Sequence, residues 1–273
     1  MEDSERKEFY SFSDAEAQRT YVSVRRAKDW VGFLLPHLKK GFCILDCGCG
    51  VGSITLDLAE LAAPGRVIGV DMDEGQLEIG RANARQRGLT NITFEQGNVY
   101  DLRFDSGTFD AALAHTLLYH LSDPLRALKE LRRVLKPSGI VAISDDDFDT
   151  LTLAPPQPLN QRAIDIMKNV VLFNGGSPFY SRNLRGLLLE AGFARTEGFA
   201  VAAEHYGRLD ETRRMASVIT RQMSDPILKT LAIGQGWTTE TEMEEIISWI
   251  REWGERPDAF MAILYCAALG WNA

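Results

Sequence analysis

The sequence predicts an α/β fold in which a parallel β-sheet is covered by helices on both faces. Between residues 43 and 144, five short apolar segments alternate with segments of helical periodicity. The five segments are apolar almost throughout, which is typical of strands buried on both faces of a sheet. A glycine-rich loop joins the first strand to the first helix of this alternation, as it does in doubly wound folds.

Local patterns predict each element of the alternating region. A capping box at Ser13–Glu16 marks the start of a helix expected to continue to Leu35, just before Pro36. Pro124 suits the first turn of a later helix, which stops before Pro137. The expected strands are 43–47, 66–71, 91–97, 108–115 and 139–144, and the expected helices between them are 53–62, 74–87 and 124–136.

The regular alternation of strands and helices is interrupted after residue 144. Residues 145–180 hold an acidic DDDFD run, a proline cluster and a helix near 160–172. A helix at 182–191 and a strand near 195–203 follow, and the strand AFMAILYCAAL ends the pattern. Residues 209–254 are helical, with an apolar stripe that indicates a face buried against the body: Met243, Ile246, Ile247 and Ile250.

We therefore expect one domain over residues 1–273. Its core comprises residues 37–144, 181–208 and 257–273, and its cap comprises residues 10–36, 145–180 and 209–256. A chain of 273 residues is long enough to bury a substantial core.

The composition and charge of the chain restrict the kinds of molecule that it is expected to bind. A formal charge of −8 disfavours nucleic acid, because binding the phosphate backbone requires clustered lysine and arginine. The sequence shows no membrane span and no signal peptide, and its four cysteines do not resemble a disulfide framework. We expect a cytoplasmic protein with a small-molecule substrate, and a homodimer is left open.

The stretch ILDCGCGVGSITLDLAE raises three alternatives for what its loop binds. Cys43, Cys47 and Cys49 lack the paired spacing of structural zinc sites, so no metal is predicted. A phosphate-binding P-loop requires a lysine that is absent here. The glycines follow GxGxG rather than the dinucleotide pattern GxGxxG, although Asp71 ends the next strand, where ribose hydroxyls are bound in such folds.

Four segments together resemble the class I S-adenosylmethionine-dependent methyltransferases, and within them the small-molecule branch that includes the ubiquinone and menaquinone biosynthesis enzymes. They are ILDCGCGVGSIT, VIGVDMDEGQLEIGRANA, the long run from ITFEQGNVYD through LKPSGIVAIS, and LRGLLLEAGF. The resemblance covers about residues 42–203. It implies a Rossmann-like fold with a mainly parallel seven-stranded sheet, the last strand antiparallel, and a helical cap.

The resemblance also implies S-adenosyl-L-methionine as cofactor and a set of residues that bind it. Asp46 would face its ammonium, Gly48 and Gly50 its amino-acid tail, and Asp71 its ribose. An Asn stands at position 98, where the family more often has Asp, and its amide oxygen can still accept a hydrogen bond from adenine. The implied cofactor-binding residues are Asp46, Gly48, Cys49, Gly50, Asp71, Met72, Gln76, Asn98, Val99 and His115.

The residues that act on the methyl acceptor are less constrained by the sequence. His120 and Tyr119 follow the fourth strand and are the candidates for modest acid–base work. Tyr10, Tyr21 and Arg25 lie in the region of the N-terminal helix, which by the resemblance folds over the donor and could line its pocket. Asp145, Asp146 and Asp147 are expected to form a solvated loop or a helix cap rather than a magnesium site. The candidate substrate-binding residues are Tyr10, Tyr21, Phe179 and Tyr180.

The predicted reaction is transfer of a methyl group to a small, apolar or aromatic acceptor by in-line displacement, with the O, C or N acceptor atom undecided. Two enzymatic alternatives are a non-methylating enzyme that keeps the same donor and a nicotinamide oxidoreductase. The latter is disfavoured because the chain has no Tyr-x3-Lys pair. A non-enzymatic alternative is a donor-binding regulatory module, which would have no use for a large cap.

Overall fold

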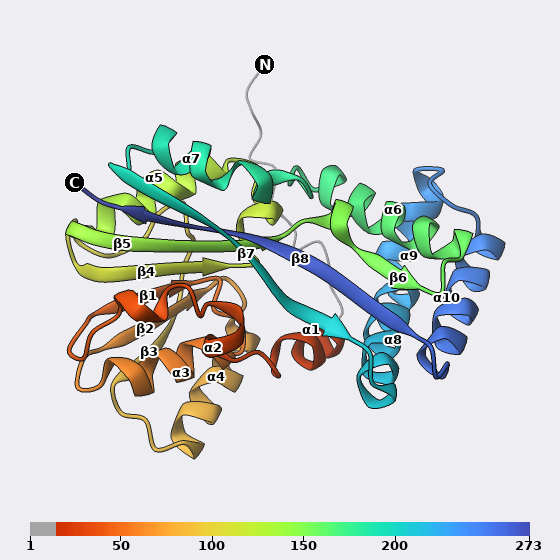
Figure 1. Cartoon of the computed structure of the whole chain (residues 1–273), viewed down its shortest axis with the longest axis horizontal. Helices are drawn as coiled ribbons and strands as arrows, with labels where there is room; N and C mark the ends of the chain where they lie inside the picture. Colours follow the sequence, from red (N-terminus) through yellow and green to blue (C-terminus); the bar gives the residue numbers. More distant parts are fainter. Residues whose placement is uncertain (1–14) are drawn as a thin grey trace.

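A computed structural model, which describes residues 15–273, has a single sheet of eight strands as its centre. The order is β3-β2-β1-β4-β5-β8-β6, and β7 lies on the other edge of β8 (Figure 1). The strands are β1 (Ile44–Cys47), β2 (Val67–Asp71), β3 (Ile92–Gln96), β4 (Phe109–His115), β5 (Leu135–Asp146), β6 (Thr152–Ala154), β7 (Arg195–Tyr206) and β8 (Phe260–Trp271).

The predicted sheet is confirmed, with one strand added. Strands β1 to β5 pair in parallel, and β8 runs antiparallel to β5, β6 and β7. The added strand is β6, which has only three residues. It pairs with residues 260–262 of β8, next to the part of β8 that pairs with β5, so it extends the line of β5.

The helices lie at or near their expected positions. Pro124 occupies the first turn of α5, and the Asp123 side chain accepts a hydrogen bond from the Arg126 amide at 2.9 Å, so this helix starts where its sequence predicts. The α-helices are α1 (Ala15–Val22), α2 (Ala27–Trp30), α3 (Ser53–Ala62), α4 (Glu74–Gln86), α5 (Pro124–Val134), α6 (Pro158–Phe173), α7 (Leu184–Glu190), α8 (Leu209–Ser224), α9 (Pro226–Gly234) and α10 (Glu240–Gly254). Short 3-10 helices are η1 (Leu35–His37), η2 (Leu118–His120), η3 (Phe148–Thr150) and η4 (Tyr180–Asn183).

The prediction of one N-terminal helix as far as Leu35 is wrong, because the helix breaks after Val22. The Ser53 hydroxyl donates to the Val22 carbonyl at 2.8 Å, and Arg26 is extended. The break lets Arg25 turn inward and become buried. The capping box that begins at Ser13 lies mostly outside the described residues.

Three apolar cores hold the molecule together. One lies between the sheet and helices α5 and α7, and a second lies on the opposite face, under α2 and α3. The third joins α6, α8, α9 and α10 at one end of the molecule, beyond the sheet strands β1 to β4 (Figure 1). Met243, Ile246, Ile247 and Ile250 are all buried in this third core, as their stripe predicts.

Within residues 15–273, none of the helices is both long and apolar enough to span a bilayer.

Candidate active site

The glycine-rich loop between β1 and α3 is held in a left-handed conformation by its neighbours. Gly48, Gly50 and Gly52 have φ values of 71°, 53° and 75°, a region that residues with a Cβ rarely adopt. The Gly48 amide donates to the Val70 carbonyl at 2.8 Å, which fixes the loop against the end of β2. A Cβ on Gly50 would have no atom within 4 Å, so the loop backbone is open to close approach at this point.

Asp71 connects this loop to the end of β2. Its Oδ2 accepts a hydrogen bond from the Gly50 amide at 2.8 Å, and its Oδ1 accepts one from the Asp73 amide at 3.0 Å. Burial raises the pKa of the Asp71 carboxyl. Each carboxylate oxygen keeps a second lone pair for a further donor. Met72, the next residue, is 60% exposed and free to pack against a planar group.

Asp46 lies beneath the loop and is 3% exposed. Its Oδ2 accepts a hydrogen bond from the Thr55 hydroxyl of α3 at 2.6 Å. Burial raises the pKa of this carboxyl to about 7, because the charged form is costly away from water. A nearby cation would restore the charge, which is compatible with the role in binding an ammonium group.

The side of the loop next to β3 carries the residues expected at an adenine. Val99 is buried, and the buried Oε1 of Gln76 has no hydrogen-bond partner. The Oδ1 of Asn98 already accepts from the Tyr100 amide at 2.9 Å. Cys49 contacts the Gly50 carbonyl through its Sγ at 3.8 Å. The residues predicted to bind the donor thus come from the end of β1 and its loop, the end of β2, α4, the segment after β3 and the end of β4.

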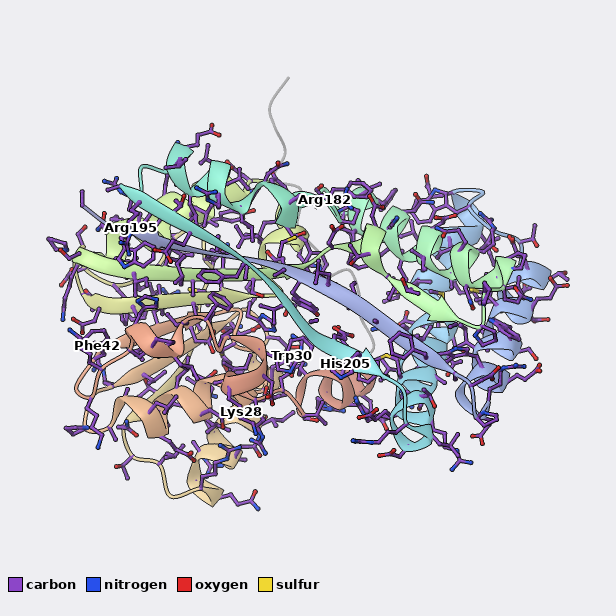
Figure 2. The ribbon with its side chains drawn as sticks, in the orientation of Figure 1. Lys28, Trp30, Phe42, Arg182, Arg195 and His205 are labelled. Carbon is purple, nitrogen blue, oxygen red and sulfur yellow. The ribbon has the colours of Figure 1, made fainter. Side chains whose placement is uncertain are left out.

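His115 ends β4 and faces a set of aromatic side chains. Its ring stacks on Tyr265 of β8 with ring centroids 5.6 Å apart, and Trp30 meets it edge-on at 5.4 Å. Figure 2 shows Trp30 beside the strands on the side of the sheet that α2 covers. Burial, with a contribution from Arg25, holds the pKa of His115 well below its usual range. The imidazole is therefore neutral at pH 7.

Beside His115 lies a group of five polar residues, four of them buried and Tyr21 partly buried, that we call the acidic–tyrosine cluster: Tyr21, Arg25, Asp146, Glu204 and Tyr265. Glu204 is 1% exposed, and its Oε2 accepts hydrogen bonds from the hydroxyls of Tyr21 at 2.6 Å and Tyr265 at 2.7 Å. Asp146 is buried, and its Oδ1 has no hydrogen-bond partner. Burial, reinforced by Glu204, raises the pKa of Asp146 well above its usual range.

Arg25 is the cation of the cluster. Its guanidinium lies 4.5 Å from the Tyr21 ring centre and 4.4 Å from the Trp30 ring centre, so aromatic faces stabilise its charge. Its Nη1 donates to the Thr116 hydroxyl at 2.9 Å, and its Nη2 lies 3.5 Å from the Tyr265 hydroxyl. Its buried Nε has no acceptor.

Asp145 and Asp146 are the last two residues of β5 and are buried, so the prediction of a solvated loop is wrong for them. Asp145 is completely buried, and its Oδ1 accepts from the Leu117 amide at 2.8 Å, while burial raises its pKa to about 7. Asp147 does act as a cap, because it accepts from the Asp149 amide at 3.2 Å at the start of η3. Within the described residues, no group of three His, Cys, Asp or Glu side chains is arranged to bind a metal ion.

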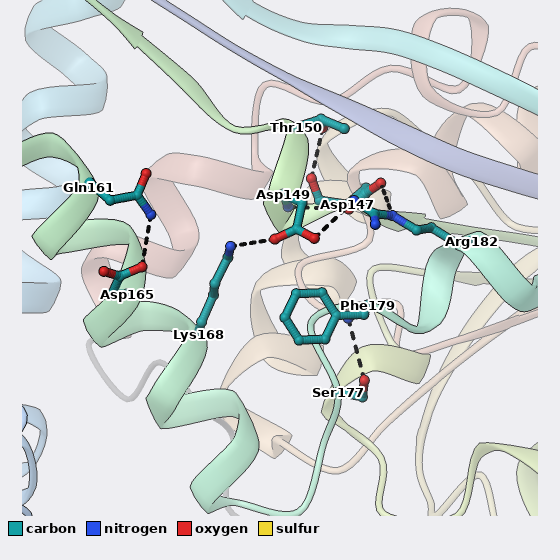
Figure 3. Close-up of polar contacts among 9 residues, drawn as sticks. All are labelled: Asp147, Asp149, Thr150, Gln161, Asp165, Lys168, Ser177, Phe179 and Arg182. Atoms are coloured by element: carbon teal, nitrogen blue, oxygen red, sulfur yellow. Dashed lines mark hydrogen bonds and ion pairs between the residues drawn. The ribbon is translucent and has the colours of Figure 1, made fainter. Parts of the chain in front are cut away.

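An ion-pair network ties Asp147 to the cap. Arg182 contacts both Asp147 oxygens, at 2.7 and 2.9 Å, and Lys168 of α6 contacts Asp149 at 2.5 Å (Figure 3). Phe179 lies over this network, with the Lys168 ammonium 5.5 Å from its ring centre. Phe179 is 37% exposed, so its ring forms part of the surface beside the end of β5.

Tyr119 and His120 join the core to the cap. Their rings lie 3.8 Å apart, and the Tyr119 carbonyl accepts from the Ser177 amide at 2.9 Å. Burial lowers the pKa of His120 to about 3. The imidazole is neutral at pH 7 and, with so low a proton affinity, a weak base.

The structure separates the predicted substrate residues. Tyr21 belongs to the acidic–tyrosine cluster, whereas Tyr180 lies near Asp123 and Glu190, whose charges add to burial in raising its pKa. Phe179 is on the cap network, and Tyr10 lies outside the described residues.

Sequence reasoning missed Glu204 and Tyr265. Glu204 is a lone acid in the apolar strand segment AVAAEHY, and that isolation is the signal that could have found it. Its neighbour His205 is exposed at the surface (Figure 2).

A profile described as "Methyltransferase domain" matches residues 38–171. The curated protein "Probable methyltransferase ltbC" of Aspergillus luteorubrus is 32% identical over 288 residues, which cover 97% of this chain and 96% of that protein. Demethylmenaquinone methyltransferase of Lactococcus lactis is 35% identical over 60% of this chain and 64% of that protein.

Among solved structures, the (4+2)-cyclase SpnF superposes with a TM-score of 0.54 at 21% identity, covering 94% of this chain and 80% of that chain. At this level of identity the likeness shows a shared fold and nothing about the reaction.

Proposed function

The chain belongs to the class I S-adenosylmethionine-dependent methyltransferases of the small-molecule branch, and we propose that the loop at the end of β1 binds its methyl donor. The donor supplies a methyl group already activated by a sulfonium. We propose that the cap and the core form one domain. The residues proposed to bind the donor are Asp46, Gly48, Cys49, Gly50, Asp71, Met72, Gln76, Asn98, Val99 and His115.

The observation that carries this proposal is the hydrogen bond between the Gly50 amide and Asp71. It places a carboxylate from the end of β2 directly against the loop at Gly50, where a Cβ would meet no atom within 4 Å. Asp71 has lone pairs left for two ribose hydroxyls, and Asp46 lies below the loop, where it suits the ammonium of the amino-acid tail. Gln76 offers a buried oxygen without a partner on the adenine side.

The finer part of the proposal concerns the acceptor. The aromatic side chains around His115 at the end of β4, Trp30 of α2 and Tyr265 of β8, favour an apolar or aromatic small molecule. Holding the acceptor atom in line with the methyl group at about 3–3.5 Å can lower the barrier by roughly 7–11 kcal/mol, so positioning supplies most of the catalysis.

His120 and Tyr119 are proposed to contribute little proton transfer. The low pKa of His120 and its contacts with Tyr119 support a packing role at the junction with the cap. We expect His120→Ala to slow turnover by no more than about 10²–10⁴-fold, the range of a single acid–base group, with donor affinity unchanged. Complete inactivity in a folded, donor-binding variant would make His120 an obligatory base.

Isothermal titration calorimetry with S-adenosylmethionine tests the donor site. Asp71→Ala should weaken binding by about 1–3 kcal/mol, because the Gly50 amide and the ribose both lose a charged acceptor. Asp210→Ala, a change at an exposed acid of α8, is the matched control and should bind normally. Absence of donor binding to the unmutated protein would overturn the proposal, and binding of a nicotinamide cofactor instead would favour the oxidoreductase.

Release of S-adenosylhomocysteine distinguishes methyl transfer from other chemistry with the same donor. A methyltransferase produces it once per turnover, with a gain of one methyl group in the product. Conversion of an acceptor without this release would favour a non-methylating enzyme of the same fold.

A further inference from the structure

Three buried polar atoms without partners belong to the carboxyl-terminal part of β5 and to the segment between α1 and α2, and the charge of Arg25 acts on Asp146. They are the Arg25 Nε, the Ser144 Oγ and the Asp146 Oδ1. All three side chains are at least nine-tenths buried. A buried polar atom without a hydrogen bond costs free energy, so such a set is matched to a ligand that satisfies it.

The pairing of β5, β7 and β8 places Asp146, Tyr265 and Glu204 on one face of the sheet. Asp146 of β5 is directly opposite Tyr265 of β8, and Glu204 of β7 is opposite Ile263, two residues from Tyr265. Directly opposed residues in antiparallel strands point to the same side of a sheet, as do residues two apart in one strand. Asp146, Tyr265 and Glu204 therefore share the face that α1 and α2 cover.

The roles of the two acids in the cluster differ. Glu204 already accepts hydrogen bonds from three tyrosine hydroxyls, those of Tyr21, Tyr265 and Tyr206. Asp146 has an oxygen without a partner and faces Glu204 of β7, Tyr265 of β8, Tyr21 of α1 and Arg25, with Asp145 beside it in β5. It is thus the carboxyl in this cluster with capacity to exchange a proton.

We propose that the acidic–tyrosine cluster binds an acceptor with an ionisable hydroxyl, a phenol or an enol, and that Asp146 takes the proton of that hydroxyl. This inference rests on the proposed function. A hydroxyl can donate to the Asp146 Oδ1 and accept from the Arg25 Nε at the same time. The nitrogen of a neutral arylamine shares its lone pair with the ring, so it is a poor acceptor for the Arg25 Nε, and its N–H is too weak an acid to give a proton to a carboxylate. A protonated alkylamine can only donate, and the fixed charge of Arg25 repels it.

The step is balanced without any further reagent. The O–H bond breaks and its proton moves to the ionised Asp146 carboxylate, leaving the oxyanion beside Arg25. The oxygen, or the ring carbon that shares its negative charge, forms a bond to the methyl carbon. The S–CH3 bond breaks, its electron pair stays on sulfur, and neutral S-adenosylhomocysteine leaves. After C-methylation, the ring C–H proton is also lost to solvent, and in either case Asp146 returns its proton to solvent.

Three probes with the same ring test the acceptor class: 1-naphthol, 1-naphthylamine and 1-naphthalenemethanol. The full-length enzyme is supplied with S-adenosylmethionine, and S-adenosylhomocysteine is measured with each probe from pH 5 to 9. We expect turnover of 1-naphthol, whose hydroxyl is ionisable, and none of the other two. The value of kcat/KM should rise with pH as Asp146 loses its proton.

Variants assign the proton acceptor. Asp146→Asn should lower kcat/KM for 1-naphthol by about 10²–10⁴-fold and move the rise in rate to the higher pH at which the probe itself ionises. Tyr21→Phe, which removes one hydroxyl from Glu204, should change the pH profile less, and it serves as the second variant if Asp146→Asn fails to fold. Glu197→Gln, at the half-exposed start of β7, is the matched control and should leave rate and profile unchanged.

Each remaining outcome counts against the inference. Preferred turnover of 1-naphthylamine, or no turnover of any probe by an enzyme that binds the donor, overturns the acceptor class. An unchanged pH profile in folded Asp146→Asn overturns the role of Asp146. Calorimetry with S-adenosylmethionine on the same preparations separates these outcomes from failure of the proposed function, in which the donor itself does not bind.

Discussion

The proposed site has a donor half around the glycine loop and an acceptor half at the acidic–tyrosine cluster, and the two differ in how far apart in the chain their residues lie. In the donor half, Thr55 binds Asp46 nine residues away, and Gly50 binds Asp71 across 21 residues. In the acceptor half, Tyr21 binds Glu204 across 183 residues and approaches Tyr265 across 244. The donor half is one strand–loop–helix–strand unit, whereas the acceptor half requires both ends of the chain to be folded.

The two halves should therefore differ in which amino-acid substitutions they tolerate. The donor half uses backbone amides and glycines, so it depends on local conformation. The acceptor half uses buried side chains from α1, β5, β7 and β8, so it depends on the packing of the N-terminal helices and the cap. We expect changes in one half to leave the other largely intact.

The largest effect is expected from Trp253→Ala in the cap core. Trp253 is completely buried, and its indole donates to the Ala154 carbonyl at 2.8 Å. Its removal should cost about 3–5 kcal/mol of unfolding free energy, measured by urea denaturation. Ile227→Ala, at a position that is 69% exposed, is the control and should change stability by no more than about 0.5 kcal/mol. Loss of donor affinity in folded Trp253→Ala would show that the halves are not independent.

A pH-dependent effect is expected from Asp145→Asn. Burial raises the pKa of Asp145 to about 7, so the folded protein holds a proton that the unfolded chain releases near its ordinary value of 3.8. Stability is therefore greater at low pH and is lost as the pH rises toward 7. Asn keeps the oxygen that binds Leu117 and has no charge, so the fall in unfolding free energy between pH 5 and 8 should shrink by about 2–3 kcal/mol.

The control for this measurement is Asp210→Asn, whose side chain is 78% exposed. It should leave the pH dependence of stability as it is in the unmutated protein. An equal pH dependence in Asp145→Asn and the unmutated protein would mean that Asp145 is ionised in the fold.

Gly52→Ala tests the donor half alone. Gly52 has a φ of +75°, and a Cβ there would come within 2.5 Å of the Phe94 ring. The strain should cost about 1–3 kcal/mol and weaken donor binding by calorimetry. Gly88→Ala has a similar φ of +67° but no atom within 4 Å of the new Cβ, so it isolates backbone strain away from the site. Equal donor affinity in the two variants would show that the contact with Phe94 does not cause the loss of donor binding.

The smallest effect on stability is expected from Phe179→Ala, which should change unfolding free energy by no more than about 0.5 kcal/mol because the ring is already 37% exposed. Its position at the cap network should alter acceptor turnover, measured as S-adenosylhomocysteine release, while donor affinity stays the same. Leu189→Ala, at an exposed position of α7, is the control. A parallel loss of turnover and donor affinity would place Phe179 in support of the donor half instead.

The sequence by itself determined the strand–helix alternation, the glycine loop and its acidic partner. These features depend on short-range periodicity and on residues such as Gly48 and Asp71, whose roles follow from backbone conformation and the strand end. Helix α3 runs over Ser53–Ala62, as the pattern predicts, because its start and stop signals are local. The break after Val22 was not predictable, since it depends on the hydroxyl of Ser53, thirty-one residues away.

Only the tertiary structure decided which acids face inward. The register of β7 against β8 shifts between Val201 and Glu204, and this single extra residue turns Glu204 to the face that carries Tyr265. Without the shift, the strict alternation of a strand would point Glu204 to the opposite face. Asp145 and Asp146 read as a polar loop in the sequence, yet pairing with β8 continues through them and buries both. Burial is a property of what packs against a residue, so the acceptor half became visible only when both ends of the chain came together.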